Sequence, residues 1–184
     1  MVEKIYNDVK NNMHKTIEHY QKEVSKIRTG RASSTMLDSI LVDYYGTPQP
    51  LKNMSNVSTP EAQLIVITPF DPSSLEMIEA AISAADLGMT PNNDGSVIRL
   101  NVPVLTEERR KDLVKILHQT IEEGRVSIRN IRRDGNDQIK KLQSDENLSE
   151  DNVKIELDNI QDLTNQYIDK LNSLQSDKEK EIMP

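Results

Sequence analysis

Four arginines in a short stretch are the residues of this sequence best suited to chemistry. They are Arg125, Arg129, Arg132 and Arg133. At about 100° per residue on a helix, all four fall on one flank of an apolar stripe and form a basic ridge. Arginine presents a planar fork of N–H donors that matches phosphate oxygens, and phosphate contacts supply most sequence-independent affinity for RNA. The spacing is that of a surface able to bind a nucleic-acid backbone.

The same arginines have an alternative interpretation as an ordinary solvated helix face. Glu122 and Asp137 stand three or four residues from ridge arginines, where ion pairs contribute only about 0.2–0.5 kcal/mol each. Spacing alone does not decide between the two interpretations. No aromatic residue interrupts the ridge, whereas proteins that bind single-stranded RNA stack its bases on aromatic side chains. If the ridge binds RNA, we expect a folded ribosomal or transfer RNA.

Catalytic chemistry is not indicated elsewhere in the chain. His14, His19 and His118 lack metal-ligand spacing, and there is no phosphate-cradling glycine loop and no Gly-x-Ser-x-Gly. The absence of cysteine excludes disulfides, thiolate metal sites and a cysteine nucleophile. An enzyme based on Glu122 or Asp137 would need a pocket that a thin helical bundle forms poorly. We therefore expect a non-enzyme with no cofactor and no metal.

The charge is segregated along the chain, although the total is −7. Residues 1–31 hold seven basic and four acidic groups (+3), and residues 105–141 hold ten and seven (+3). Residues 32–104 hold two and eight (−6), and residues 142–184 hold four and eleven (−7). A polyanion responds to the local charge within a Debye length, so the acidic total does not exclude RNA. There is no signal peptide and no apolar run of about 20 residues, so we expect a cytoplasmic protein without membrane contact.

Three stretches carry apolar residues in steps of three and four and predict long helices at 2–27, at 105–143 and from 150 onward. Thr106 and Ser149 are the expected N-caps of the last two helices, and residues 145–147 the turn between them. Because each stripe must be buried, we expect an elongated antiparallel three-helix bundle built from residues 1–29 and 105–184. Gly124 and Gly135, on the apolar side of the middle helix, would allow close helix approach.

Residues 31–104 have a different character and predict a small inserted α+β domain. Strands are expected at 40–45, 64–67 and 97–102, a helix at 72–85, and turns at 46–48 and 91–95. Two crossings, at 28–31 and 103–105, connect this domain to the bundle and are expected to form a hinge. The expected hinge residues are Thr29, Gly30, Arg31, Pro103, Val104 and Leu105.

Six blocks in order and with matching spacing resemble the ribosome recycling factor family of bacteria and organelles. They are KIRTGRAS (26–33), DYYGTP (43–48), PFD (69–71), DLGMTPN (86–92), LTEERRKDL (105–113) and VSIRNIRRD (126–134). The resemblance implies an L-shaped α+β protein with transfer-RNA-like dimensions, a three-helix bundle and a β/α/β domain on a two-stranded hinge. Ser34 departs from the family pattern, since many relatives carry proline there, and this departure would loosen the first hinge strand.

The resemblance also implies a function and partners. Family members bind the post-termination ribosome and, with elongation factor G and GTP, split it into subunits. Their bundle lies on large-subunit rRNA near an intersubunit bridge, their small domain meets elongation factor G, and we expect a monomer. Arg129 and Arg132 match family rRNA contacts, and Arg28 and Arg31 flank the hinge. The expected rRNA-binding set is Arg28, Arg31, Arg109, Arg110, Arg125, Arg129, Arg132 and Arg133.

The alternative hypothesis belongs to a different functional class: a helical structural adapter with no RNA partner. Its apolar stripes would bury themselves by oligomerisation, and its arginines would be solvated.

Overall fold

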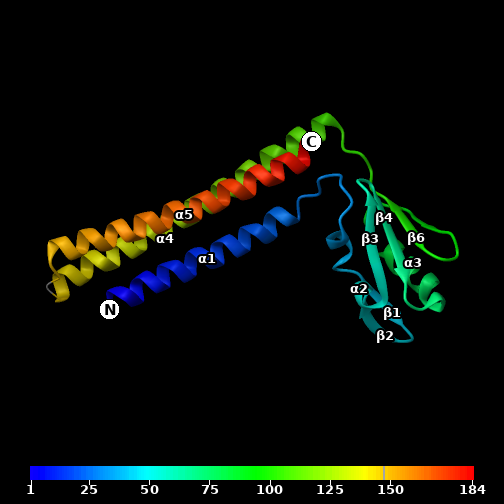
Figure 1. Ribbon diagram of the computed structural model, residues 1–184, viewed down its shortest axis with the longest axis horizontal. Helices are drawn as coiled ribbons and strands as arrows, with labels where there is room; N and C mark the ends of the chain where they lie inside the picture. Colours follow the sequence, from blue (N-terminus) through cyan, green and yellow to red (C-terminus); the bar gives the residue numbers. More distant parts are fainter. Residues whose placement is uncertain (147) are drawn as a thin grey trace. The chain divides into compact units, whose positions relative to one another are not determined.

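The computed structural model describes residues 1–146 and 148–184, which divide into two compact units. The helical unit comprises Met1–Thr29 and Glu107–Pro184, and the sheet unit comprises Gly30–Thr106 (Figure 1). The chain leaves the helical unit once and re-enters it once, so the sheet unit is an insertion. The expected α+β class, with long helices packed as a bundle and a small inserted domain, is confirmed.

Three helices make up the helical unit: α1 (Val2–Ser25), α4 (Glu107–Glu146) and α5 (Glu150–Ile182). Each of them packs against the other two. With 40 residues, α4 is about 60 Å long at 1.5 Å per residue. Ser149 caps α5 as expected, because its hydroxyl accepts a hydrogen bond of 3.3 Å from the backbone N–H of Asn152. The expected turn is wrong at Asp145 and Glu146, which are helical, and Asn147 lies outside the described residues.

The apolar stripes form the core of this unit. In α1 the buried stripe residues are Val9, Met13, Ile17 and Val24. In α4 they are Leu113, Leu117, Ile121, Ile128 and Ile139, and in α5 they are Val153, Ile160, Thr164, Tyr167 and Leu171. Leu163, which the stripe omitted, is also buried. The three faces are therefore covered within one chain.

Gly124 lies at a close approach of the three helices. A Cβ built at this position would lie 3.2 Å from Cδ1 of Leu171 on α5 and 3.2 Å from Cδ2 of Tyr20 on α1. Glycine therefore lets the helices pack closely here, as its place on the apolar side of α4 predicted.

The sheet unit contains a two-stranded hairpin and a four-stranded antiparallel sheet. The hairpin consists of β1 (Leu41–Tyr44) and β2 (Thr47–Pro50). The sheet has the order β3-β4-β6-β5, with β3 (Ser55–Glu61), β4 (Leu64–Pro69), β6 (Ile98–Asn101) and β5 (Pro91–Asn93). The helical segments are η1 (Ser34–Leu37), α2 (Leu51–Met54), η2 (Pro72–Ser74) and α3 (Leu75–Ala84). Their shared core includes Val42, Ile65, Ile78 and Leu100.

The predicted strands match β1, β4 and β6, and the predicted helix matches η2 and α3. The sequence missed β2, β3 and β5, and it assigned part of β2 and all of β5 to turns. These strands lack an apolar alternation; in β3 only Ser55 is buried, and Pro60 is tolerated because β3 lies at the edge of the sheet. Edge strands of this kind form because a neighbour supplies hydrogen bonds, which a local pattern does not reveal.

The two predicted hinge segments meet at Gly30 and Leu105, which both belong to the sheet unit. Gly30 has a φ of +74°, a left-handed conformation that favours glycine, and a Cβ there would lie 2.9 Å from Cγ of Leu105. Arg31, Pro103 and Val104 belong to the same unit, whereas Thr29 ends the first segment of the helical unit. The second boundary follows Thr106, one residue beyond the expected crossing.

Candidate nucleic-acid interface

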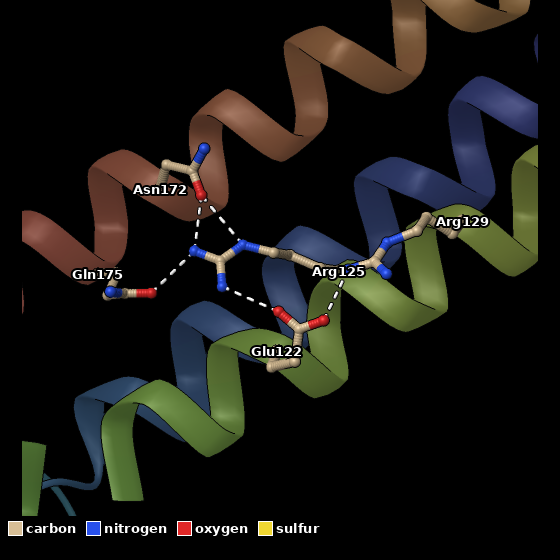
Figure 2. Close-up of polar contacts among 5 residues, drawn as sticks. All are labelled: Glu122, Arg125, Arg129, Asn172 and Gln175. Atoms are coloured by element: carbon tan, nitrogen blue, oxygen red, sulfur yellow. Dashed lines mark hydrogen bonds and ion pairs between the residues drawn. The ribbon is translucent and has the colours of Figure 1, made fainter. Parts of the chain in front are cut away.

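The basic ridge of α4 is held against α5 at two of its four arginines. Arg125 donates from Nε and Nη2 to Oδ1 of Asn172, at 3.0 and 2.7 Å, and from Nη2 to Oε1 of Gln175, at 2.8 Å. Its side chain is only 21% exposed. Figure 2 shows the guanidinium pointing from α4 toward these two amides on α5. Arg125 thus fastens the bundle as well as supplying charge.

Arg132 repeats the arrangement two turns further along α4. Its Nη1 donates to Oε1 of Gln161 at 2.8 Å, and Gln161 in turn donates to Oδ1 of Asn165 at 2.9 Å. Nε of Arg132 and Oδ1 of Asn136 are buried and have no hydrogen-bond partner within the described residues. The guanidinium is therefore oriented by α5, while part of its donor capacity is unused.

Glu122 joins Arg125 to Arg129. Its Oε1 accepts from Nη2 of Arg129 at 2.6 Å, and its Oε2 accepts from Nη1 of Arg125 at 3.1 Å (Figure 2). The hydrogen bond from Arg129, followed by that from Arg125, lowers the pKa of Glu122 below its ordinary value, because both arginines stabilise the ionised carboxylate. The pairing with Glu122 that the solvated-face interpretation required is therefore present.

Arg133 differs from the other three ridge residues. Its side chain is exposed, and within residues 1–146 and 148–184 it forms no ion pair or hydrogen bond. Asp137, the other acid expected to neutralise the ridge, likewise forms no ion pair in that part of the chain. The ridge thus combines two anchored arginines, one arginine paired with a carboxylate, and one arginine available to an outside anion.

The other predicted contact residues are more scattered. Arg109 and Arg110 lie on α4 about 24 Å before Arg125, from the rise of 1.5 Å per residue. Arg109 is exposed but points about 160° around the helix from Arg125, whereas Arg110 is half-buried with an Nε that lacks a partner among the described residues. Arg28 follows α1 and is exposed, and the exposed Arg31 lies in the sheet unit. Along α4, Arg109 and Arg110 therefore lie well apart from the ridge.

Sequence reasoning missed the α5 residues that orient the ridge. Gln161, Asn172 and Gln175 supply the acceptors for Arg132 and Arg125. A signal was present, since Gln161, Asn165, Asn172 and Gln175 recur along α5 in steps of four, seven and three. His118 and Glu179 continue the same seam with a contact of 3.4 Å between Nε2 and Oε2.

The acidic residues considered for an enzyme site, Glu122 and Asp137, do not line the pocket described here. A pocket of about 270 Å³ is lined by sheet-unit residues that include Ser34, Asp38 and Lys52, whereas Glu122 and Asp137 lie on α4. Among the described residues, no group of His, Cys, Asp and Glu is arranged to hold a metal ion. Across the same residues, none of the helices has the length and apolar character needed to cross a membrane.

Comparison with known proteins gives a consistent family. The family model described as "Ribosome recycling factor" matches residues 20–183. The ribosome-recycling factor of Nostoc sp. (strain PCC 7120) is 52% identical over 175 residues, covering 95% of this chain and 96% of that protein. The Bacillus subtilis (strain 168) protein of the same name is 45% identical, covering 100% of this chain and 99% of its own.

Comparison with solved structures points to the same family. A solution structure of the ribosome recycling factor has a TM-score of 0.81 and 42% identity, covering 99% of this chain and 97% of that one. A second has a TM-score of 0.69 and 40% identity, with full coverage of both chains. It is described as models for the T. thermophilus ribosome recycling factor and the E. coli elongation factor G bound to the E. coli post-termination complex. The six sequence blocks, the fold and these matches together show that this chain belongs to the ribosome recycling factor family.

Proposed function

We propose that this chain is a non-catalytic translation factor that binds the post-termination ribosome and, with elongation factor G and GTP, splits it into subunits. The observation that carries the proposal is full-length similarity to a solved relative described as bound, with elongation factor G, to the post-termination complex. Both chains are covered completely in that comparison, so the bundle and the inserted unit each have a counterpart.

The ridge of α4 is the surface we assign to large-subunit rRNA near an intersubunit bridge. The orientation of Arg125 and Arg132 by amides of α5 supports this assignment, because it fixes two guanidinium groups before binding and lowers the entropic cost of contact. Arg129 and Arg133 supply the more accessible donors. Arg28, Arg31, Arg109 and Arg110 complete the proposed set as contacts spread over a larger area, typical of recognition by backbone and shape.

The sheet unit is the part on which elongation factor G would act. Residues 32–104 carry a net charge of −6, from two basic and eight acidic groups, so this segment is repelled by phosphate while the ridge is attracted. The helical unit would then transmit force as a lever anchored on rRNA. The proposed hinge lies at Thr29, Gly30 and Arg31 and at Pro103, Val104 and Leu105.

A polysome-breakdown assay with purified elongation factor G tests the function. We expect the chain to convert polysomes into free subunits only when elongation factor G and GTP are both present, and reactions with GDP or without elongation factor G are the controls. Intact polysomes under the complete conditions, with an elongation factor G from the same organism, would refute the proposal. We place this activity in the cytoplasm, where ribosomes and elongation factor G are found together.

The adapter hypothesis loses its main support in the structure. It required apolar stripes that are covered only in an oligomer, whereas Met13, Ile121 and Leu171 are buried within one chain. We therefore propose a monomer. Sedimentation separates the hypotheses: a monomer of 20.9 kDa that co-sediments with ribosomes fits a recycling factor, and a dimer that ignores ribosomes fits an adapter.

A further inference from the structure

One carboxylate occupies the position in the ridge where a phosphate would be expected. The two oxygens of Glu122 are divided between two arginines, with Arg129 at 2.6 Å and Arg125 at 3.1 Å. A phosphate group bridging two guanidinium groups would use the same donors, because arginine recognises both anions through planar N–H forks. The free protein thus already holds an anion of its own in this part of the ridge (Figure 2).

The two arginines are not equally committed to Glu122. Arg125 is 21% exposed and keeps three hydrogen bonds to Asn172 and Gln175 that do not involve the carboxylate. Arg129 is 42% exposed, and Glu122 is its hydrogen-bond partner within the described residues. An incoming phosphate can therefore take Arg129 from Glu122 without disturbing Arg125.

We propose that Glu122 is an internal competitor for RNA phosphate: its carboxylate holds Arg129 in the free protein and lowers the affinity of the ridge for the ribosome. The inference rests on the proposed function, since it concerns the same rRNA-binding surface. It adds a residue of opposite charge whose effect is to weaken binding. A factor that must leave the ribosome after each round benefits from such a limit on affinity.

Competition outweighs any positioning by Glu122 for a geometric reason. If Glu122 mainly oriented the arginines, its removal would disorder both of them. Arg125 would remain held by the α5 amides, so little order is lost there. Arg129 would lose an exposed ion pair, which contributes little to its placement in water. The larger consequence of neutralising Glu122 is one fewer negative charge beside the bound phosphate.

The test compares Glu122→Gln with the natural protein in binding to purified vacant ribosomes at fixed salt. We expect about three- to tenfold tighter binding, mainly through slower dissociation. Glu123→Gln is the matched control, because it removes the same charge from the next residue. Glu123 is exposed, lies about 160° around α4 from Arg125, and forms no ion pair in the described part of the chain. We expect Glu123→Gln to change binding less than twofold.

A second comparison places both variants in an Arg129→Gln background. In this background Glu122→Gln should no longer raise the affinity for ribosomes appreciably, because Arg129, the arginine that Glu122 holds in the natural protein, is absent. Unchanged or weaker binding by Glu122→Gln, an equal gain with Glu123→Gln, or a gain that persists without Arg129 would each overturn the inference and leave the proposed function intact. Failure of the natural protein to bind ribosomes at all would overturn both. Thermal melting of each variant checks that the bundle is folded.

Discussion

Gly135 of α4 lies directly against Val9 of α1: a Cβ built on this glycine would come within 2.6 Å of Cγ2 of Val9. Both residues are buried, and Cδ1 of Ile160 on α5 lies 3.5 Å from the same point. No side chain larger than hydrogen fits without movement of α1 or of Val9. The distance between α1 and α4 therefore depends on this glycine.

Replacing Gly135 should reveal that dependence. Alanine normally stabilises a helix by about 1 kcal/mol relative to glycine, but overpacking a core costs about 1–3 kcal/mol. At 2.6 Å the clash dominates, so we expect Gly135→Ala to lower the free energy of unfolding by about 1–2 kcal/mol. Urea unfolding followed by circular dichroism measures this difference.

Two comparisons make the Gly135 prediction specific. The nearest contacts at Gly124 are 3.2 Å, so Gly124→Ala should have a smaller effect because helix propensity offsets milder crowding. Val9→Ala should cost less stability in the Gly135→Ala background than in the natural protein, since there it also removes the clashing methyl group. Equal losses at both glycines, or strict additivity with Val9→Ala, would contradict the role of this contact.

Arg132 is the ridge residue to test first for RNA binding. We expect Arg132→Ala to weaken ribosome binding by about tenfold, because one phosphate contact is lost. The slope of the logarithm of the binding constant against the logarithm of the salt concentration should become shallower by about 0.7–0.9. Binding is measured at several salt concentrations, and subunit splitting separately at saturating protein. If both binding and splitting are unchanged, Arg132 does not anchor the bundle.

Gln161→Ala is the matched control for Arg132. It removes the 2.8 Å hydrogen bond between α4 and α5 but keeps the guanidinium. Both variants should lose about 0.5–1.5 kcal/mol of stability through that bond. Only Arg132→Ala should show the reduced salt dependence. A similar reduction in Gln161→Ala would mean that the binding loss comes from bundle disruption.

Tyr45 carries backbone strain in the β1–β2 hairpin. Tyr44 pairs with Thr47, so Tyr45 and Gly46 form the two-residue turn, with φ values of 50° and 85°. Positive φ at both positions is typical of a type I′ turn, which favours Asn-Gly. The Tyr45 side chain is 71% exposed and gains little from burial. We expect Tyr45→Asn to raise the free energy of unfolding by about 0.5–1 kcal/mol, measured by urea unfolding. The rings of Tyr45 and Tyr44 meet edge to face, with centroids 4.8 Å apart. A loss of stability would show that this ring contact outweighs the strain.

Asp94 should give the sheet unit a pH-dependent stability. Backbone N–H groups of Val97 and Ser96, and then the Arg99 guanidinium, lower the pKa of Asp94 from 3.8 to about 2. Because the folded-state pKa is depressed, this stabilisation is complete above about pH 4 and is lost as the pH falls toward 2.

Asp94→Asn tests the assignment, since the amide oxygen can still accept the backbone hydrogen bonds. We expect the variant to have a lower Tm than the natural protein at pH 6. The difference in Tm between the two should narrow from pH 4 to pH 2. A difference that stays constant across this range would contradict the ionic contribution of Asp94.

The sequence by itself determined the helices and the family. The spacing of apolar residues in steps of three and four predicted α1, α4 and α5, because a long apolar stripe on a helix must be buried against another element. Ser149 predicted the start of α5, because a serine side chain caps a helix through a local hydrogen bond. The angular position of the four arginines also followed from helical geometry, which depends only on residue spacing.

Only the tertiary structure decided what each arginine does. Arg125 and Arg132 differ from Arg133 because Asn172, Gln175 and Gln161, 29 to 50 residues away, reach the first two. Edge strand β3 likewise depends on hydrogen bonds to β4 and not on its own residue pattern. The contact between Gly135 and Val9 joins residues that are distant in sequence and adjacent after folding. Spacing within one helix specifies which way a side chain points, whereas its partners depend on the register between helices, which the packing of all three faces sets together.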